Sequence, residues 1–377
     1  MNNEIVLQLE PSPDNGRNSE GAFIALRDGR IAFAWSKYTT PNSSDHGRAS
    51  LACIFSEDEG RTWGGETILV EPAPDEANVM SVSLLRLQNG RILFAYARKI
   101  DHGDGTLDCR PVVRFSDDEL QTLSEPRLAT PLPGYYVLNN DRIVQLQSGR
   151  LLMPLALHRF KLPSQAAPDG TIAPAFARSA QILFLHSDNG GQSWLEAVNS
   201  LLADFPDGQG FQEPGLVELQ NGELWAWMRT AWSGGDPLGP RQWETRSGDS
   251  GLTWSTPRSS AFVSPCSPLS MKRIPQTGEL LAVWNDRSGR FDLPEPQPGS
   301  NGRTPLVSAL SDDEGRTWQH HKLIEDAPDH GFCYTAIHFV ADAVLLAYCA
   351  GGAETRGLLN RLRIRRIPLE ELRGNSC

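Results

Sequence analysis

The sequence predicts an all-β fold, a six-bladed β-propeller, and two internal repeats carry this prediction. The first repeat is an octapeptide that reads Ser-Asp-Asp-Glu-Gly-Arg-Thr-Trp at Ser311 to Trp318 and recurs four more times. The second is a tight glycine turn between two apolar runs. Successive octapeptides begin 60, 71, 60 and 64 residues apart, which is long for a solenoid coil but suits one four-stranded blade with generous loops.

The octapeptide is expected to be a turn between two antiparallel strands. Clear copies span Ser56 to Trp63 and Ser247 to Trp254, whereas Ser187 to Trp194 has Asn189 in place of Asp and Ser116 to Leu123 has lost the Gly and the Trp. The carboxylate accepts backbone N–H groups, the Gly takes a positive φ and the Trp packs under neighbouring strands. We therefore interpret the turn as structural.

The glycine turns predict one β-hairpin each. Their glycines are Gly29, Gly90, Gly149, Gly222 and Gly278. A sixth hairpin, Phe339 to Leu345, follows at the same spacing without a glycine. Six hairpins, five of them followed by an octapeptide, predict six blades. Two terminal strands, Ile5 to Leu9 and Leu362 to Ile367, are expected to close the ring in the last blade.

The bulk properties predict a single domain over residues 1–377. The net charge of -11 argues against nucleic acid and anionic membrane surfaces as partners. The N-terminus has no basic start followed by a long apolar core, so we expect no signal peptide and a cytoplasmic location. Six cysteines lack pair spacing and read as reduced thiols, and no zinc motif appears, so we expect neither metal nor cofactor.

Proline-rich loops at residues 163–174, 234–240 and 294–305 follow the second strand of a hairpin. They leave the sheet at the end opposite the glycine turn, where first strands begin and second strands end. This end is therefore expected to form the mouth of a functional pocket. The charged and polar residues expected there are Glu20, Asn78, Arg142, Glu213, Tyr334, Lys37, Arg98, His158, Arg229 and Arg303. Such a density of arginine predicts a pocket for a small carboxylate.

These motifs resemble those of the sialidases (exo-neuraminidases). The octapeptides resemble the Asp boxes of that family, also called BNR repeats. The segment from Glu213 through Val217-Glu218-Leu219 to the glycine turn, with Arg229 sixteen residues after Glu213, reproduces a family spacing. Arg303, eight residues before an octapeptide, resembles the last arginine of the family's triad, and Tyr334 resembles the tyrosine nucleophile.

The resemblance implies an exo-glycoside hydrolase that releases a terminal sialic acid or a similar acidic sugar from a small glycan. Tyr334 is then the nucleophile, because a neutral phenol can approach an anomeric carbon that carries a carboxylate. Glu213 takes its proton, Arg229 and Arg303 bind the substrate carboxylate, and Asp45, in the loop of the first blade, protonates the leaving oxygen.

One position departs from the family pattern. The family's first triad arginine stands about ten residues before the first glycine turn, where this chain has Ser19 or Glu20. Arg17, Lys37 or Arg98 is expected to supply the third cation. Arg142 and His158 are further candidates for contact with the substrate.

Two alternatives remain open. The first is a propeller lyase or hydrolase for uronate- or rhamnose-containing glycans, with His46 or His158 as the catalytic group. The second is a glycan-binding propeller without catalysis, in which Glu213 and Arg229 are simply a buried ion pair.

Overall fold

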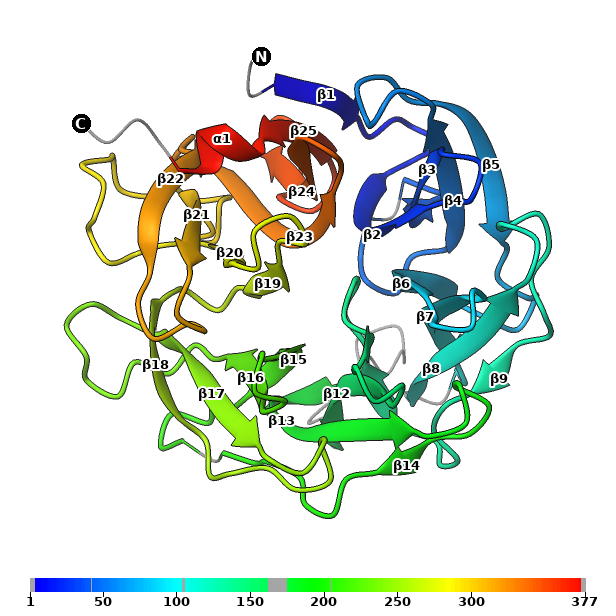
Figure 1. Ribbon diagram of the computed structural model, residues 1–377, viewed down its shortest axis with the longest axis horizontal. Coiled ribbons are helices and arrows are strands. Elements are labelled where there is room, and N and C mark those ends of the chain that lie inside the picture. The colour runs from blue at the N-terminus through cyan, green and yellow to red at the C-terminus, as the bar shows by residue number, and fades with distance from the viewer. Residues whose placement is uncertain (1–3, 42, 104–105, 162–174, 204, 374–377) are drawn as a thin grey trace, which may run out of the picture.

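The computed structural model describes the chain except for residues 1–3, 42, 104–105, 162–174, 204 and 374–377, so the predicted loop at 163–174 lies outside the described residues. The described part contains 25 strands and one short helix, α1 (Leu369–Leu372). That helix is neither long nor apolar enough to cross a membrane. The sheets stand side by side around a common centre, as Figure 1 shows. The prediction of an all-β fold is confirmed.

In three of the four-stranded sheets, the strands lie across the sheet in the order in which they follow along the chain. The first contains β2 (Arg17–Ala25), β3 (Ile31–Tyr38), β4 (Ala49–Ser56) and β5 (Gly64–Val70). The second contains β15 (Gln212–Glu218), β16 (Leu224–Arg229), β17 (Arg241–Ser247) and β18 (Arg258–Val263). The third contains β19 (Ser270–Arg273), β20 (Leu280–Trp284), β21 (Leu306–Ser311) and β22 (Gln319–Glu325).

A nine-stranded sheet occupies the place where the sequence predicts the second and third blades. Its first half contains β6 (Asn78–Arg86), β7 (Ile92–Asp101), β8 (Leu107–Ser116) and β9 (Arg127–Leu128). Its second half contains β10 (Tyr135–Val137), β11 (Val144–Gln145), β12 (Leu151–Lys161), β13 (Ala175–Ser187) and β14 (Leu195–Glu196). The two halves join because β10 pairs with β12 and also, in parallel through Tyr135 and Cys109, with β8.

The two ends of the chain meet in one sheet. It contains β1 (Glu4–Leu9), β25 (Leu362–Pro368), β24 (Ala343–Gly352) and β23 (His330–Phe339), in that order across the sheet. Both terminal strands expected from the sequence therefore lie side by side here. Apolar layers fill the space between neighbouring sheets; Phe33 and Trp35 of β3, for example, pack with Leu345 and Ile364 of this terminal sheet.

The octapeptide turns join the third and fourth strands of their units by a repeated set of hydrogen bonds. In the turn after β17, the Ser247 hydroxyl bonds Asp249 and accepts from the Gly251 N–H, and Asp249 accepts from the Thr253 N–H and hydroxyl. The fourth and fifth residues of each turn have positive φ, including Glu119 and Leu120 in the copy without glycine. The turn chemistry inferred from the sequence is therefore present even in the degenerate copy.

Polar side chains link the inner strands across the centre of the ring. Between β10 and β11 the chain lies against the inner strands of two other sheets, and there the Asn140 Nδ2 donates to the carbonyls of Gly21 at 2.8 Å and Tyr334 at 3.1 Å. Next to it, Asp141 pairs with the Lys272 Nζ at 2.7 Å and accepts from the Ile337 N–H. Residues from four separate sheets are thus tied together where no main-chain ladder can run.

Replacing Asn140 by Ala is expected to lower the free energy of unfolding by about 2 to 4 kcal/mol, because two buried carbonyls lose their donor. Urea denaturation followed by tryptophan fluorescence measures the loss. Asn221→Ala, at an exposed glycine turn, is the matched control and is expected to cost less than about 1 kcal/mol. A cost for Asn140→Ala as small as that of the control would contradict the cross-link.

The octapeptide turns also predict a pH dependence of stability. Burial alone would raise the pKa of Asp249, but the hydrogen bonds from Thr253, Ser247 and the backbone outweigh it and lower the pKa to about 2. Because an unfolded Asp titrates near 3.9, this stabilisation is fully present above about pH 4 and is lost as the pH falls toward 2.

We therefore expect the unfolding free energy of the wild type to fall more steeply between pH 4 and pH 2 than that of Asp249→Asn. Asn is a suitable replacement because Asn189 already occupies this place in another turn, where its side-chain oxygen accepts the same backbone N–H. Equal slopes in the two proteins would show that Asp249 does not contribute.

Candidate active site

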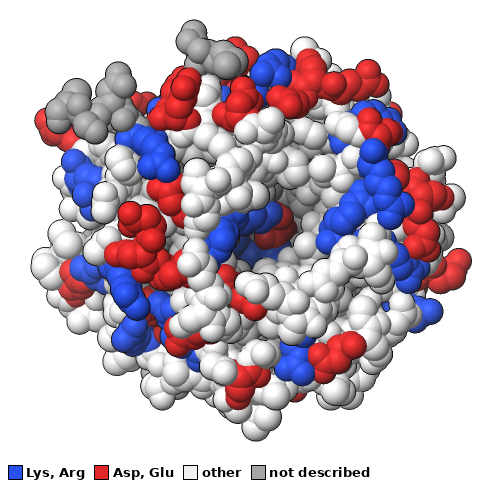
Figure 2. All heavy atoms as spheres, in the orientation of Figure 1, with Lys and Arg blue, Asp and Glu red and all other residues white. Residues whose placement is uncertain are grey.

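A small pocket of about 70 Å³ lies at the centre of the ring, at the end expected from the sequence. Figure 2 shows one face of the ring, which is hollowed at its centre and has basic and acidic side chains around the hollow. The residues that line it are Glu20, Asp45, Met80, Ser81, Ala97, Lys99, Cys109, Tyr135, Val137, Leu138, Asn139, Glu213 and Tyr334. Three carboxylates, one ammonium group and two phenols therefore converge on a space close to the size of a few water molecules.

The same backbone device directs four of these side chains into the pocket. The inner strands β2, β6, β15 and β23 each have a register shift against their neighbour, and each shift contains one non-glycine residue with positive φ. These residues are Glu20 (φ 55°), Ser81 (φ 59°), Glu213 (φ 48°) and Tyr334 (φ 59°). A bulge re-aims a side chain, and a left-handed conformation at a non-glycine residue is strained and typical of functional sites.

Tyr334 and Glu213, 121 residues apart in the chain, form a buried hydrogen bond in which the phenol donates to Glu213 Oε1 at 3.0 Å. Glu213 Oε2 lies 2.8 Å from Arg229 Nη1, and the same nitrogen lies 3.4 Å from the Tyr334 hydroxyl. Arg229 Nη2 donates to Gln212 at 3.1 Å. Although the ion-pair distance is short, Glu213 Oε2 has no well-aligned hydrogen bond, so it retains an acceptor site.

Arg303 completes this side of the site without a carboxylate partner among the described residues. Its guanidinium lies 5.5 Å from the centre of the Tyr334 ring, Nη1 donates to Cys333 Sγ at 3.2 Å and Nη2 donates to the Cys266 carbonyl at 3.2 Å. Burial alone would lower the pKa of Arg303, but the neighbouring thiol, phenol and Glu213 raise it. Arg303 is thus a charged group whose counter-ion is not supplied by a nearby acid.

Burial is the main reason why the pKa of Tyr334 is raised well above its usual value, and the charge of Glu213 adds to this effect. Arg229 and Arg303 act in the opposite direction. The phenol is therefore protonated in the free protein, and Glu213 is the acceptor placed to take its proton.

Arg17 is buried next to the pocket and is bound by two carboxylates, Glu20 and Asp45, that do line it. Its Nη1 lies 2.6 Å from Asp45, its Nη2 lies 2.7 Å from Glu20, and its Nε donates to Ser19 at 2.8 Å. Burial alone would raise the pKa of Asp45, but Arg17 and Lys99 outweigh it and hold this pKa well below its usual range. For Glu20, burial prevails over Arg17 and raises the pKa.

The loop that carries Asp45 is anchored from the second unit. The Lys99 Nζ and the Asn78 Nδ2 donate to the Asp45 carbonyl at 2.7 and 2.8 Å, and Asn78 also donates to Gly47 at 2.9 Å. The Asp45 side chain itself is 58% exposed at the mouth, whereas Glu20 is buried on the wall.

Two of the cations expected from the sequence lie elsewhere. Lys37 pairs with Glu66 on the outer strand β5, and Arg98 lies 3.5 Å from Glu76. The neighbour of Arg98, Lys99, enters the pocket instead, because successive side chains of a strand point to opposite faces. Lys99 is one residue from the predicted Arg98, and the alternation of side chains along β7 would have identified it.

Arg142 and His158 do not line the central pocket. Arg142 is buried beside it, with Nη2 donating to the Leu269 carbonyl at 2.8 Å and Nε without a partner, and burial lowers its pKa to about 10. His158 bonds the Ala177 carbonyl through Nδ1 at 2.9 Å and lines a separate cavity of about 290 Å³. The ring of Tyr135 is close to both His158, at 6.2 Å, and His46, at 6.3 Å.

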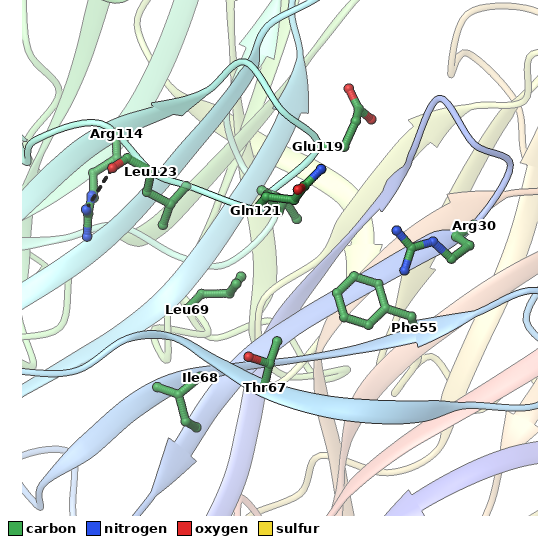
Figure 3. Close-up of a pocket in the computed structure, with 10 residues that line it drawn as sticks. Arg30, Phe55, Thr67, Ile68, Leu69, Arg114, Glu119, Gln121 and Leu123 are labelled. Atoms are coloured by element: carbon green, nitrogen blue, oxygen red, sulfur yellow. Dashed lines mark hydrogen bonds between the residues drawn. The ribbon is translucent and has the colours of Figure 1, made fainter.

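A larger cavity of about 340 Å³ lies away from the centre, between β5 and the octapeptide turn that follows β8. In Figure 3, Arg30 lies beside the Phe55 ring and Arg114 bonds the Leu123 carbonyl. Its acid, Glu119, is already paired with Arg86. This cavity shares no residue with the central pocket and lacks its convergence of acids and phenols, so we assign the candidate site to the smaller pocket.

Comparisons with known proteins bear on the family and on the fold of the chain. A family model described as a BNR repeat-like domain matches residues 84–346. A search of curated proteins finds no match. Solved structures share the fold at low identity, which bears on the fold alone.

A protein of unknown function from Dyadobacter fermentans has 17% identity and a TM-score of 0.68, with 97% of this chain and 99% of that chain covered. The NanB sialidase of Streptococcus pneumoniae has 13% identity and a TM-score of 0.67, with 98% and 71% covered. A leech intramolecular trans-sialidase has 15% identity and a TM-score of 0.67, with 99% and 71% covered. The family match shows that the chain belongs to the BNR repeat-like family, and these neighbours show that it shares the fold of solved sialidases.

Proposed function

We propose that the protein is a sialidase-like exo-glycoside hydrolase that releases a terminal sialic acid, or a similar acidic sugar, through Tyr334. The observation that carries the proposal is the buried hydrogen bond from the Tyr334 hydroxyl to Glu213, beside Arg229 and Arg303. It joins a nucleophile and a base that line the small pocket with two neighbouring guanidiniums that are not part of its lining. Membership of the BNR repeat-like family and a fold shared with solved sialidases support a glycosidase as the kind of enzyme.

In the first step, the Tyr334 oxygen forms a bond to the anomeric carbon and Glu213 takes the phenolic proton. The bond from that carbon to the leaving oxygen breaks, and Asp45 donates a proton to this oxygen. A water molecule then cleaves the tyrosyl sugar with Asp45 as base, and Glu213 returns the proton to Tyr334. A phenol suits this role because it is neutral when an anionic sugar arrives.

The substrate carboxylate binds to Arg229 and Arg303 in this proposal. Arg303 has no acidic partner among the described residues, and Arg229 has only Glu213. A planar guanidinium binds a carboxylate through two parallel hydrogen bonds, which fixes the orientation of the sugar as well as its charge. Arg17 is the third cation of the pocket, but Glu20 and Asp45 already occupy it.

The exposed position of Asp45 suits a donor to the leaving group, since the aglycone of an exo-enzyme points out of the mouth. Its pKa, however, is held low by Arg17 in the free protein. Asp45 can carry a proton at neutral pH only when Arg17 turns from it toward the substrate. The proposed mechanism therefore requires the Arg17 pair to open on binding.

A second candidate is a lyase or hydrolase for uronate- or rhamnose-containing glycans. The engagement of Arg17 by two carboxylates favours it, because only two guanidiniums then remain for the substrate anion. His46, whose Nε2 lies 3.4 Å from the Tyr135 hydroxyl, would be its catalytic base, and burial lowers the pKa of this imidazole. A glycan-binding protein without catalysis is the outcome if no acidic glycoside is turned over.

The arrangement that we propose for the whole chain is a six-bladed propeller. The nine-stranded sheet then represents two blades joined through β10, and β1 closes the ring beside β25. Each blade supplies one inner strand, and the central pocket lies where these inner strands converge.

Tyr334→Phe is expected to lower kcat on 4-methylumbelliferyl sialoside at least 1,000-fold, because the nucleophile is lost, and Glu213→Gln about 100-fold or more. Fluorometric release of the aglycone measures both. Tyr348→Phe is the matched control, since the buried Tyr348 hydroxyl also donates to a glutamate flanked by arginines but lies outside the pocket. Near wild-type activity in Tyr334→Phe would rule out the proposed nucleophile.

Asp45→Asn is expected to slow hydrolysis of an alkyl sialoside at least 100-fold and of the 4-methylumbelliferyl sialoside less than about 10-fold, because a good leaving group needs little protonation. The two kcat/KM ratios are compared for one enzyme preparation, which removes the effect of incomplete folding. Equal losses on both substrates would exclude Asp45 as the proton donor.

A further inference from the structure

Two of the four strained bulge residues have no part in the proposed chemistry. Glu213 and Tyr334 are the base and the nucleophile, whereas Glu20 and Ser81 stand at the equivalent bulges of the first and second units and line the same pocket. Glycine would adopt this left-handed conformation without strain, yet both positions carry polar side chains that face the pocket. The same strained backbone conformation at all four bulges indicates that Glu20 and Ser81 also contact the ligand.

Glu20 is fixed as a hydrogen-bond acceptor. Its Oε1 is bound by Arg17 Nη2 at 2.7 Å, and its Oε2 accepts the hydroxyl proton of Ser81. Each carboxylate oxygen has two acceptor sites, so each retains one that can face the pocket. Glu20 is only 5% exposed, and a buried carboxylate with open acceptor sites is costly unless a donor fills them.

The charges around the pocket determine which ligand group can approach Glu20. A substrate carboxylate is repelled by Glu20 and attracted to Arg229 and Arg303, which lie with Tyr334. The anionic group of the sugar therefore faces the arginines, and the ring groups on another side meet Glu20. Among the groups of a sugar ring, a hydroxyl is the donor that an ionised carboxylate binds well.

We propose that Glu20, held by Arg17 and Ser81, determines specificity by accepting a hydrogen bond from one hydroxyl of the acidic sugar bound against Tyr334. This proposal rests on the proposed function and adds a residue that the sequence resemblance does not assign. It makes Glu20 a substrate-binding group and leaves proton donation to Asp45.

The test combines Glu20→Gln with a set of monodeoxy 4-methylumbelliferyl sialosides, each lacking one hydroxyl of the sugar ring or of its side chain. For one analogue the wild type is expected to lose about 10- to 100-fold in kcat/KM, the range for a hydrogen bond to a charged group. On the full substrate, the kcat/KM of Glu20→Gln is expected to fall below that of the wild type by a similar factor, mainly through KM. Replacing the full substrate by that analogue is expected to lower the kcat/KM of Glu20→Gln by less than about a further 3-fold.

Glu119→Gln is the matched control. Glu119 is also a left-handed, arginine-paired glutamate, but it lies in the octapeptide turn after β8, outside the pocket. It is expected to leave kcat/KM within about 2-fold of the wild type. If Glu20→Gln melts at a clearly lower temperature, Ser81→Ala is used in its place. Its kcat/KM on the full substrate is expected to fall by about 3- to 10-fold, and for one analogue the missing hydroxyl is expected to cost it less than it costs the wild type.

The proposal would be overturned if, for every analogue, the loss in kcat/KM from the substitution and the loss from the missing hydroxyl were simply additive. A loss in Glu20→Gln that appears with an alkyl sialoside but not with the 4-methylumbelliferyl substrate would also overturn it, because that pattern identifies a proton donor. If the wild type hydrolyses no sialoside, the proposed function fails by itself. Glu20 is then tested by calorimetric titration with free N-acetylneuraminic acid, where equal affinities of the wild type and Glu20→Gln would overturn the proposal.

Discussion

The candidate site depends on the constraint that a regular strand cannot turn two successive side chains to the same side. The inner strands escape this constraint by a bulge in which one residue adopts a left-handed conformation. At Glu213 and Tyr334 the result is a direct hydrogen bond between sheets far apart in the sequence. The conformational strain is sustained by the surrounding framework, in which Asn140 bonds the Tyr334 carbonyl itself.

The buried arginines at the centre differ in the groups that balance their charge, and this difference determines how readily each can bind an incoming anion. Arg17 is shared by two carboxylates, Arg229 has one, and Arg303 has a thiol, a carbonyl and the face of an aromatic ring. Removing a guanidinium from water is costly without a counter-ion. Affinity for an incoming anion should therefore increase from Arg17 to Arg303, and in the proposed mechanism the binding energy of an acidic sugar is concentrated beside Tyr334.

The sequence predicted those features that depend on a local pattern of residues. The glycine and octapeptide turns predicted the hairpins, and the spacing from Glu213 to Arg229 indicated two residues that do meet. Pairings that depend on the path of the chain were harder to predict. The inner strand of the third unit is split into β10 and β11, and β10 joins two predicted blades, which no turn signal indicates. Lys99 in place of Arg98, and the two acids on Arg17, follow from side-chain direction and loop position rather than from sequence spacing.

The Arg17 cluster links the choice of substrate to the supply of a proton. In the free protein Arg17 holds Asp45 ionised, and an ionised Asp45 cannot protonate a leaving group. In the proposed mechanism, a ligand anion that draws Arg17 away removes the stronger of the two cations, Arg17 and Lys99, that lower the pKa of Asp45, so protonation of Asp45 becomes easier as the negative charge of the substrate arrives. A neutral sugar leaves the pair closed. The pocket would then reject neutral glycosides by withholding the proton donor as well as by weaker binding, which is a sharper form of discrimination than charge attraction alone.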